Sequence, residues 1–136
     1  MEDLVFSLLI SYSAPGAIPA KLLAPAIMHT ADKYDVDPVQ LTQIILTESR
    51  GLEHAYNPRT QDYGLMQINI KTAAAYNVSQ RELFQWRKNL DAGAKVLSQF
   101  DRICRYNVGT ARLQGPRLDR CLHYERKLAS FTLEAL

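Results

Sequence analysis

Apolar residues recur at helical rather than strand spacing along most of the chain. One helix face is predicted by the spacing i, i+3, i+4 and i+7, which is occupied by Leu41, Ile44, Ile45 and position 48. The same spacing predicts helices over residues 25–34, 90–100 and 121–131, and a short helical turn over 71–76. No long alternation of Val, Ile and Thr predicts a substantial sheet. We therefore expect a mainly α fold of about six to seven short helices.

Local signals indicate where several of these helices begin and end. Asp37 before Pro38 is typical of a helix start, with Gln40 completing the spacing of a capping box. Ser79 and Glu82 repeat that spacing. Gly51 is the expected end of the helix that begins at Pro38. The polar residues 51–63 are predicted to form a loop, and Gly115-Pro116 is predicted to break the chain before the last helix.

The length of 136 residues predicts one domain. We assign residues 21–136 to that domain and expect residues 1–20 to pack on it or to precede it. The apolar run from Leu4 to Ile10 is too short to span a bilayer. Acidic Glu2 and Asp3 stand where a secretory signal carries positive charge. Neither a transmembrane segment nor a recognisable signal peptide is therefore expected.

Charge is unevenly distributed along the chain, whose net charge is +2. Residues 1–80 carry 5 basic and 8 acidic side chains, whereas residues 81–127 carry 11 and 5. The basic half favours contact with an anionic polymer such as nucleic acid or a cell-wall polymer. Arginines on solvated helix faces produce the same pattern. Because no groove-reading motif accompanies the charge, nucleic acid is not expected as a partner.

Cysteine and histidine usage indicates no metal site. Two cysteines are too few for a disulfide scaffold. Cys104 and Cys121 either pair in an oxidising compartment or remain two buried thiols, and buried thiols are the preferred interpretation. The three histidines are scattered and form no HExxH spacing. We expect no metal and no cofactor.

Glu48 stands where an apolar residue would complete the helix face. Partial burial and the negative end of the helix dipole both disfavour its charged form, and so both raise its pKa. A carboxyl group that stays protonated near neutral pH can donate a proton to a glycosidic oxygen. A lone glutamate at a helix end is more often solvated, or paired with a residue such as Arg50. The residues that follow decide between these interpretations.

Four motifs follow in a recognisable order: ESR (48–50) with GLMQI (64–68), NLDAGAKVL (89–97), RYNVG (105–109) and YERKL (124–128). Together they resemble the catalytic domain of lytic transglycosylases, in the lysozyme-like superfamily, over about residues 38–128. The spacing is most similar to the small single-domain members that open the wall for secretion systems, pili or phage entry. The resemblance implies a single lysozyme-like domain around a glycan-binding cleft.

The resemblance also implies an activity. Such an enzyme is a peptidoglycan lytic transglycosylase, which cleaves the β-1,4 bond between MurNAc and GlcNAc and leaves 1,6-anhydro-MurNAc ends. Glu48 would be its single catalytic acid/base. The implied partners are peptidoglycan glycan strands, together with a phage virion or a secretion or pilus apparatus. The implied place of action is the periplasmic or cell-wall side, reached by virion delivery or another export route.

The substrate-binding residues implied by the resemblance are Ser49, Asn57, Gly64, Leu65, Met66, Gln67, Tyr106, Asn107 and Tyr124. Residues 64–67 would form one cleft wall, and Tyr106 with Asn107 the opposite one. The Tyr106 hydroxyl is the candidate hydrogen-bond partner of Glu48, and Tyr124 would complete the floor. Core positions for Met66 and Ile68, and a simple turn at Asn57, are alternative interpretations.

The sequence departs from the family pattern near the second wall. Arg105 stands before Tyr106, where the family usually has small residues, and the stretch from 89 to 106 is short. This predicts a more open cleft, with Arg102, Arg105 and Arg112 available to the carboxylates of peptide stems.

Two other functions fit the same motifs. One is a hydrolytic muramidase, which would use Asp62 as a second carboxylate, although aspartates beside turns are more often structural. The other is a wall-binding or virion structural module without catalysis.

Overall fold

The computed structural model describes residues 1–135, which form eight α-helices and one small sheet. The helices are α1 (Glu2–Tyr12), α2 (Ala20–Tyr34), α3 (Pro38–Glu48), α4 (Ile70–Ala75), α5 (Gln80–Leu83), α6 (Trp86–Ser98), α7 (Arg105–Val108) and α8 (Pro116–Ala129). The prediction of a mainly α fold is confirmed. The helix count exceeds the expected six or seven because α5 and α7 have only four residues each, too few to show a period.

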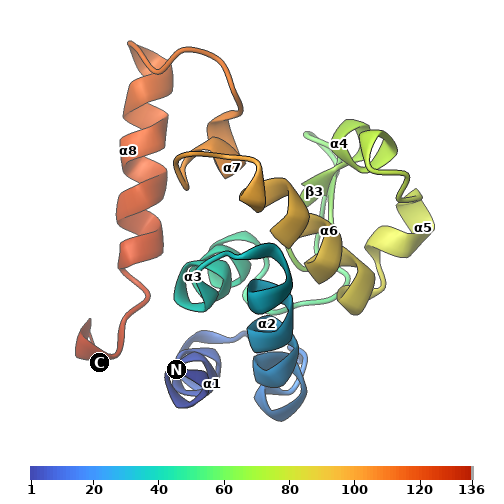
Figure 1. The fold of residues 1–136 in the computed structure, drawn as a ribbon, viewed down its shortest axis with the longest axis vertical. Helices are drawn as coiled ribbons and strands as arrows, with labels where there is room; N and C mark the ends of the chain where they lie inside the picture. The colour runs from blue at the N-terminus through green and yellow to red at the C-terminus, as the bar shows by residue number, and fades with distance from the viewer. Residues whose placement is uncertain (136) are drawn as a thin grey trace.

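Helix α3 lies at the centre of the molecule, between α1 and α2 on one side and α6, α7 and α8 on the other (Figure 1). Leu41, Ile44 and Ile45 are fully buried, as their spacing predicted. The Asp37 side chain caps the helix by accepting from the N–H groups of the second and third helical residues, at 2.7 and 3.2 Å. This cap confirms the predicted start.

Helix α3 ends at Glu48, three residues before the predicted stop. Ser49 is the C-cap, and both Arg50 (φ 53°) and Gly51 (φ 85°) adopt left-handed backbone conformations that turn the chain. Glu48 is therefore the last helical residue. This end of α3 carries the negative pole of the helix dipole.

The N-terminal segment forms helix α1 and shares the core of the rest of the chain. Val5, Leu8 and Leu9 are buried against α2 and α3. The Tyr12 hydroxyl donates to the Thr132 carbonyl, so α1 also holds the C-terminal segment, which ends in the 3-10 turn Leu133–Ala135. The two ends of the chain lie on the same side of the molecule (Figure 1).

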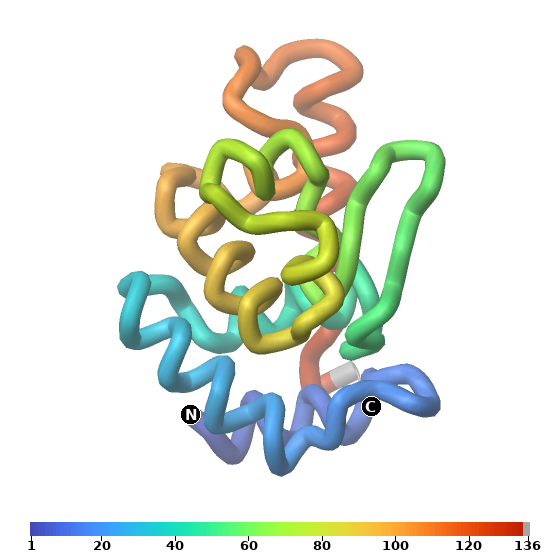
Figure 2. The backbone as a smooth tube through the Cα atoms, turned by 90° about the vertical axis from the view of Figure 1, so that its right-hand side faces the viewer, coloured from blue at the N-terminus to red at the C-terminus, as the bar shows by residue number. Residues whose placement is uncertain are grey.

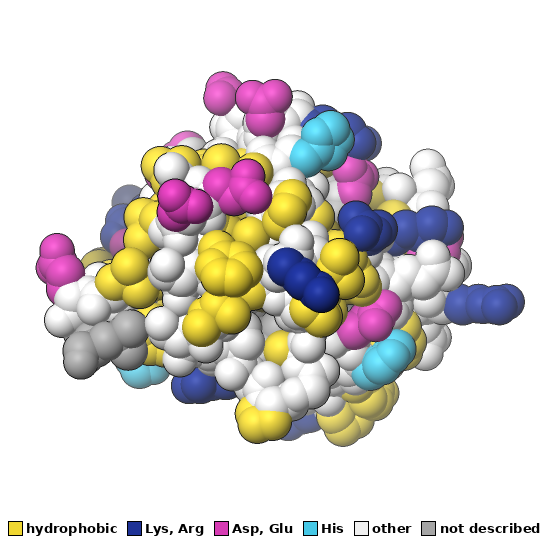
Figure 3. All heavy atoms as spheres, turned by 90° about the horizontal axis from the view of Figure 1, so that it is seen from below, with side chains coloured by type: hydrophobic (Ala, Val, Ile, Leu, Met, Phe, Trp, Pro, Cys, Tyr) yellow, Lys and Arg dark blue, Asp and Glu magenta, His cyan; other side chains and the backbone are white. Residues whose placement is uncertain are grey.

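Apolar side chains gather near the middle of the face that is seen from below in Figure 3. Phe6 and Ile10 on α1 are 40% and 64% exposed. Among residues 1–135, no helix combines the length and the apolar composition that crossing a bilayer requires.

The segment predicted as a loop contains two of the three strands. Strands β1 (Tyr56–Asn57), β2 (Asp62–Tyr63) and β3 (Ile68–Asn69) pair antiparallel in the order β1-β2-β3, with Tyr63 opposite both Tyr56 and Ile68. The β1–β2 hairpin stands beside the helices in Figure 2. Strands of two residues are too short to show an alternating pattern, which explains the wrong prediction.

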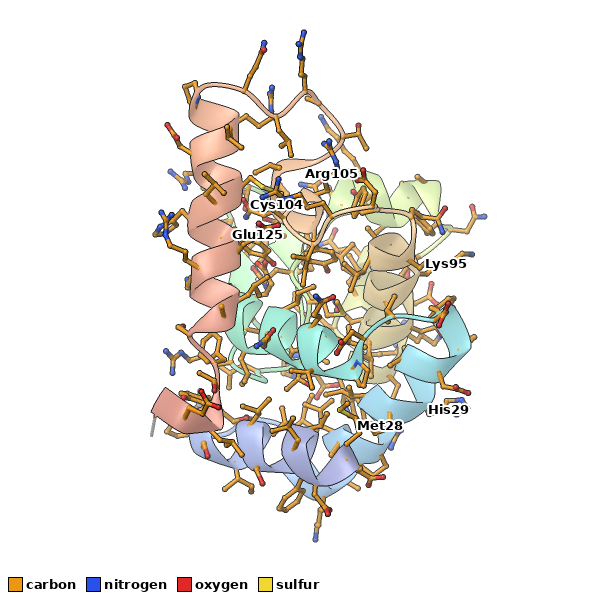
Figure 4. All side chains as sticks on the ribbon, turned by 60° about the vertical axis from the view of Figure 1, so that its left-hand side comes forward. Met28, His29, Lys95, Cys104, Arg105 and Glu125 are labelled. Atoms are coloured by element: carbon orange, nitrogen blue, oxygen red, sulfur yellow. A yellow bond between two sulfur atoms is a disulfide. The ribbon has the colours of Figure 1, made fainter. Side chains whose placement is uncertain are left out.

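The preferred interpretation of the cysteines is also wrong. Cys104, just before α7, and Cys121 in α8 form a disulfide, with their Cα atoms 5.0 Å apart. Next to it Arg102 makes two hydrogen bonds to Glu125, at 2.7 and 2.9 Å. Figure 4 labels Cys104 and Glu125 at this seam between α7 and α8. The spacing of the cysteines in sequence does not show that α8 returns to this point.

Candidate active site

Glu48 lies where two hollows of the surface meet. The first, here called the long cleft, has a volume of about 660 Å³ and runs between β2, β3, α4, the end of α6 and α7. The second, here called the α8 groove, has a volume of about 500 Å³ and lies between the end of α3 and α8. Both Glu48 and Asn107 line both hollows. An extended ligand that crosses from one hollow to the other must therefore pass Glu48.

The surroundings of Glu48 favour its protonated form. Burial raises the pKa of its carboxyl group from 4.5 to about 7, and the nearby charge of Asp62 acts in the same direction. A hydrogen bond from the Tyr124 hydroxyl and the positive charge of Lys127 lower the pKa, but burial outweighs them. A pKa near 7 allows one carboxyl group to give up a proton and to take one back at neutral pH.

Tyr124, and not Tyr106, is the hydrogen-bond partner of Glu48. The Tyr124 hydroxyl donates to Glu48 Oε2 at 2.7 Å. The Tyr106 hydroxyl donates instead to the carbonyl oxygen of Met66, also at 2.7 Å. The predicted contact was wrong because α8 crosses the end of α3, whereas α7 faces the turn at residues 64–67. Burial and the negative charge of Glu48 raise the pKa of both tyrosines, so both hydroxyls remain donors.

The turn at residues 63–66 is built around Asn89, a fully buried polar side chain of α6. Asn89 Oδ1 accepts from the Met66 N–H at 2.8 Å, and Asn89 Nδ2 donates to the carbonyl oxygens of Tyr63 and Leu83 at 2.9 Å. Gly64 (φ 79°) fits because a Cβ there would lie 2.2 Å from the Leu83 carbonyl oxygen. The turn is therefore fixed in one position beside Glu48.

The two residues that follow this turn, Gln67 and Ile68, line the long cleft. Gln67 adopts a left-handed backbone (φ 50°), and its Nε2 donates to the carbonyl oxygens of Ala55 and Gly64 at 2.9 and 3.0 Å. These bonds hold the Gln67 amide in one orientation. Ile68 supplies an apolar surface beside the Gln67 amide, although Ile68 is only 4% exposed.

The model of one protein family, the transglycosylase SLT domain, matches residues 25–115. The match covers more than half of the 136 residues. The chain belongs to the transglycosylase SLT domain family. No curated protein and no solved structure matches the chain.

Membership of the SLT family supports lytic transglycosylase activity on peptidoglycan in general, and with it a glycan-cleaving enzyme. Peptidoglycan lies outside the cytoplasmic membrane, so this SLT domain acts on the periplasmic or cell-wall side. The disulfide agrees with this assignment, because disulfides persist in oxidising compartments.

Several of the predicted substrate-binding residues lie away from both hollows of the SLT domain. Leu65 and Met66 are fully buried, so their side chains belong to the core and Gly64 supports the wall from behind. Ser49 is buried in the turn after α3, where its hydroxyl donates to the Ile45 carbonyl and accepts from the Gly51 N–H. Asn57 caps a local turn by accepting from the Arg59 N–H at 3.1 Å. Within the described residues these side chains are engaged by the protein itself.

Two of the arginines predicted to face peptide stems are engaged inside the domain. Arg102 is paired with Glu125. Arg105 is paired with Asp101 and donates to the carbonyl oxygens of Gly109 and Ala111. Arg105 does line the long cleft, but its guanidinium holds the chain that follows α7. Both arginines thus have partners inside the domain, and their contact with peptide stems stays a prediction.

The sequence pattern did not single out Asn89 or Lys127 as residues of the site. Asn89 was detectable as a polar residue on the apolar face of the helix that carries Leu90 and Ala94. Lys127 lies within the YERKL motif, but it is one of several basic residues on α8, and only the packing of α8 on α3 brings it near Glu48.

Proposed function

We propose that this SLT domain cleaves the β-1,4 bond between MurNAc and GlcNAc of peptidoglycan and forms 1,6-anhydro-MurNAc ends, with Glu48 as the only acid/base. The observation that carries the proposal is a single carboxyl group with a pKa of about 7 at the junction of two hollows. A glycan strand lying through both hollows brings one glycosidic bond next to Glu48.

The chemistry needs one proton donor that becomes a base. Protonated Glu48 gives its proton to the glycosidic oxygen, the C1–O bond breaks, and positive charge develops at C1 of MurNAc. The 6-hydroxyl of the same sugar then attacks C1 and passes its proton to the Glu48 carboxylate. The anhydro ring closes, no water is consumed, and Glu48 returns to its protonated form.

Tyr124 and Lys127 suit the second half of this cycle. The Tyr124 hydroxyl donates to Glu48, and Lys127 lies close enough to favour its negative charge. Both therefore stabilise the carboxylate that exists between the two proton transfers. Gln67 and Asn107 line the cleft with side-chain amides, which suit the hydroxyl and N-acetyl groups of sugars.

A hydrolytic muramidase is the second candidate, because Asp62 also lines the long cleft and its charge acts on Glu48. Both carboxylate oxygens of Asp62 are engaged, one by the Thr60 hydroxyl at 2.7 Å and one by the Asn69 amide at 3.2 Å. A carboxylate held in this way ties β2 to β3 and is poorly suited to activate water. This favours the transglycosylase.

Digestion of purified peptidoglycan with the wild type and with Glu48→Gln tests the proposal. We expect anhydro-muropeptides from the wild type, detected by mass spectrometry, and a loss of roughly 10²- to 10⁴-fold in rate for Glu48→Gln. Asp62→Asn should retain most of the activity and yield the same anhydro products.

Each other outcome selects a different function. Reducing-end products, heavier by one water, together with inactivity of Asp62→Asn would make the protein a muramidase. Wall binding without products from either protein would leave a non-catalytic wall-binding or virion module.

Local opening of the cell wall for a phage particle, a pilus or a secretion apparatus is the biological role we propose for this cleavage. The motif spacing that resembles the small wall-opening members is its support.

A further inference from the structure

The wall of the α8 groove is a basic helix face. Arg120, Tyr124 and Lys127 follow at i, i+4 and i+7, so they lie on one side of α8. The Tyr124 hydroxyl touches Glu48, which shows that this side faces the proposed acid. His123 lines the same groove. The basic side chains and Glu48 are therefore exposed to one ligand at the same time.

Arg120 and Lys127 differ from Arg102 and Arg105 in having no ion-pair partner among residues 1–135. The ion pairs of the described residues use Lys33, His54, Lys88, Arg102 and Arg105 as cations, and neither Arg120 nor Lys127 is among them. Asp119 is the one other acidic residue lining the groove besides Glu48. When Glu48 is protonated, two permanent positive charges face one negative charge.

A polar group without a partner lies next to these cations. The Thr47 hydroxyl is buried and has no hydrogen-bond partner within the described part of the chain, and Thr47 lines the groove. Buried hydroxyl groups are nearly always paired. Thr47 is therefore an unsatisfied polar position at the edge of the groove.

We propose that the α8 groove binds an anionic group on the side chain of a MurNAc residue next to the cleaved bond. This inference rests on the proposed function. MurNAc differs from GlcNAc by a lactyl ether, which ends in a carboxylate or carries a peptide stem with carboxylates of its own. The shared chemistry is a carboxylate held by Arg120 and Lys127, with Asn107 at the junction of both hollows. Recognition of this group would set which sugar stands on which side of Glu48.

Helix α8 lies outside residues 25–115, the part of the chain that the family model matches. The YERKL motif of residues 124–128, which supplies Tyr124 and Lys127, lies on this helix. The groove is a further candidate contact for the anionic parts of the wall, because Arg102 and Arg105 already have partners within the domain.

Binding measurements in the Glu48→Gln background test the groove without cleavage and without the effect of Lys127 on the pKa of Glu48. The variants are Arg120→Gln with Lys127→Gln, and Arg126→Gln as a control that removes one charge from an exposed position of α8 lining neither hollow. The ligands are glycan fragments with peptide stems, the same fragments stripped by an amidase to the lactyl carboxylate, and an uncharged chitooligosaccharide. Calorimetry at low and high salt gives each Kd, and thermal unfolding checks that all variants are folded.

We expect the double variant to bind at least one of the two anionic ligands about tenfold more weakly, with a difference that shrinks at high salt. Weakening for the stem-bearing fragment alone identifies a stem carboxylate, and weakening for the stripped fragment alone identifies the lactyl carboxylate. Weakening for both supports a groove that accepts either source. The Arg126→Gln variant should bind all three ligands as the Glu48→Gln parent does.

Equal binding of the anionic ligands by the double variant and the Arg126→Gln control would overturn the inference. An equal loss for the chitooligosaccharide would overturn it as well, because charge would not be what is recognised. Neither result depends on whether the wild type forms anhydro ends, so failure of this inference and failure of the proposed function are distinguishable.

Discussion

The two walls that flank Glu48 are held in place by different means. The hairpin wall, residues 55–69, is fixed by short-range backbone geometry and by one buried amide, Asn89. The C-terminal wall, residues 104–127, is fixed by a disulfide and by the ion pair of Arg102 with Glu125. The Tyr106 hydroxyl joins the two walls through the Met66 carbonyl.

This difference indicates a division of roles. The hairpin wall packs tightly against the core at Gly64, where a Cβ would lie 2.2 Å from the Leu83 carbonyl oxygen. The C-terminal wall lies mostly on the surface, and its two helical segments depend on a covalent link for their relative position. We expect substitutions in the first wall to affect stability, and some substitutions in the second wall, such as those at Tyr124, to change the environment of Glu48 as well.

The largest effect is expected at Gly64. Gly64→Ala combines a left-handed backbone with a Cβ 2.2 Å from a backbone oxygen, and should cost about 3 kcal/mol or more of unfolding free energy. Gly16→Ala is the matched control, because Gly16 has a similar φ of 83° and no atom within 4 Å. It should cost roughly 1 kcal/mol. Urea denaturation measures both, and similar losses would show that the turn is not sterically fixed.

Next in size is the disulfide of the C-terminal wall. Replacing Cys104 and Cys121 together by Ser should lower the unfolding free energy by about 3 kcal/mol, as expected for a loop of this length. The loss of activity should exceed the loss that the lower stability alone would cause. Tyr106 and Tyr124 lie beside the two cysteines, so loss of the disulfide should also displace these tyrosines. Reductant should lower the melting temperature and the activity of the wild type and leave the double-Ser variant unchanged. A wild type that keeps its activity under full reduction would contradict this account.

Removal of the Tyr124 hydroxyl should shift the pH dependence of cleavage. Its hydrogen bond lowers the pKa of Glu48, so Tyr124→Phe should move the upper limb of the pH–rate profile to higher pH, by roughly one unit. Tyr106→Phe removes a hydrogen bond to a carbonyl instead, and should cost about 1 kcal/mol of stability without moving that limb. If both variants shifted the limb equally, the two tyrosines would not have separate roles.

A comparably small effect is expected on the free energy of unfolding when Glu48 is replaced. The pKa of Glu48 is raised to about 7 in the folded state from an ordinary 4.5. Ionisation therefore opposes folding as the pH rises through this range, and below about pH 4.5 there is no penalty. Glu48→Gln should match the wild type at pH 4 and exceed its unfolding free energy at pH 8 by about 1 to 2 kcal/mol, after allowance for partial exposure. Thermal unfolding at the two pH values measures this, and equal stability at pH 8 would contradict a raised pKa.

The sequence alone determined several of the longer helices and the candidate acid. The period of Leu41, Ile44 and Ile45, with the cap at Asp37, predicted α3 because both signals are local to one helix. Glu48 stood out because a carboxylate on an apolar face conflicts with its surroundings. The order of the motifs indicated the family that the match over residues 25–115 confirms.

Only the tertiary structure decided what touches Glu48. The partner is Tyr124 rather than Tyr106, the cysteines form a disulfide rather than two thiols, and Met66 lies in the core rather than on the cleft. Each of these depends on contacts between segments far apart in the chain, such as Glu48 and Tyr124, which are separated by 76 positions. Local periodicity tells which face of a helix is buried, but not which other element covers it, since that choice follows from how all the helices pack at once.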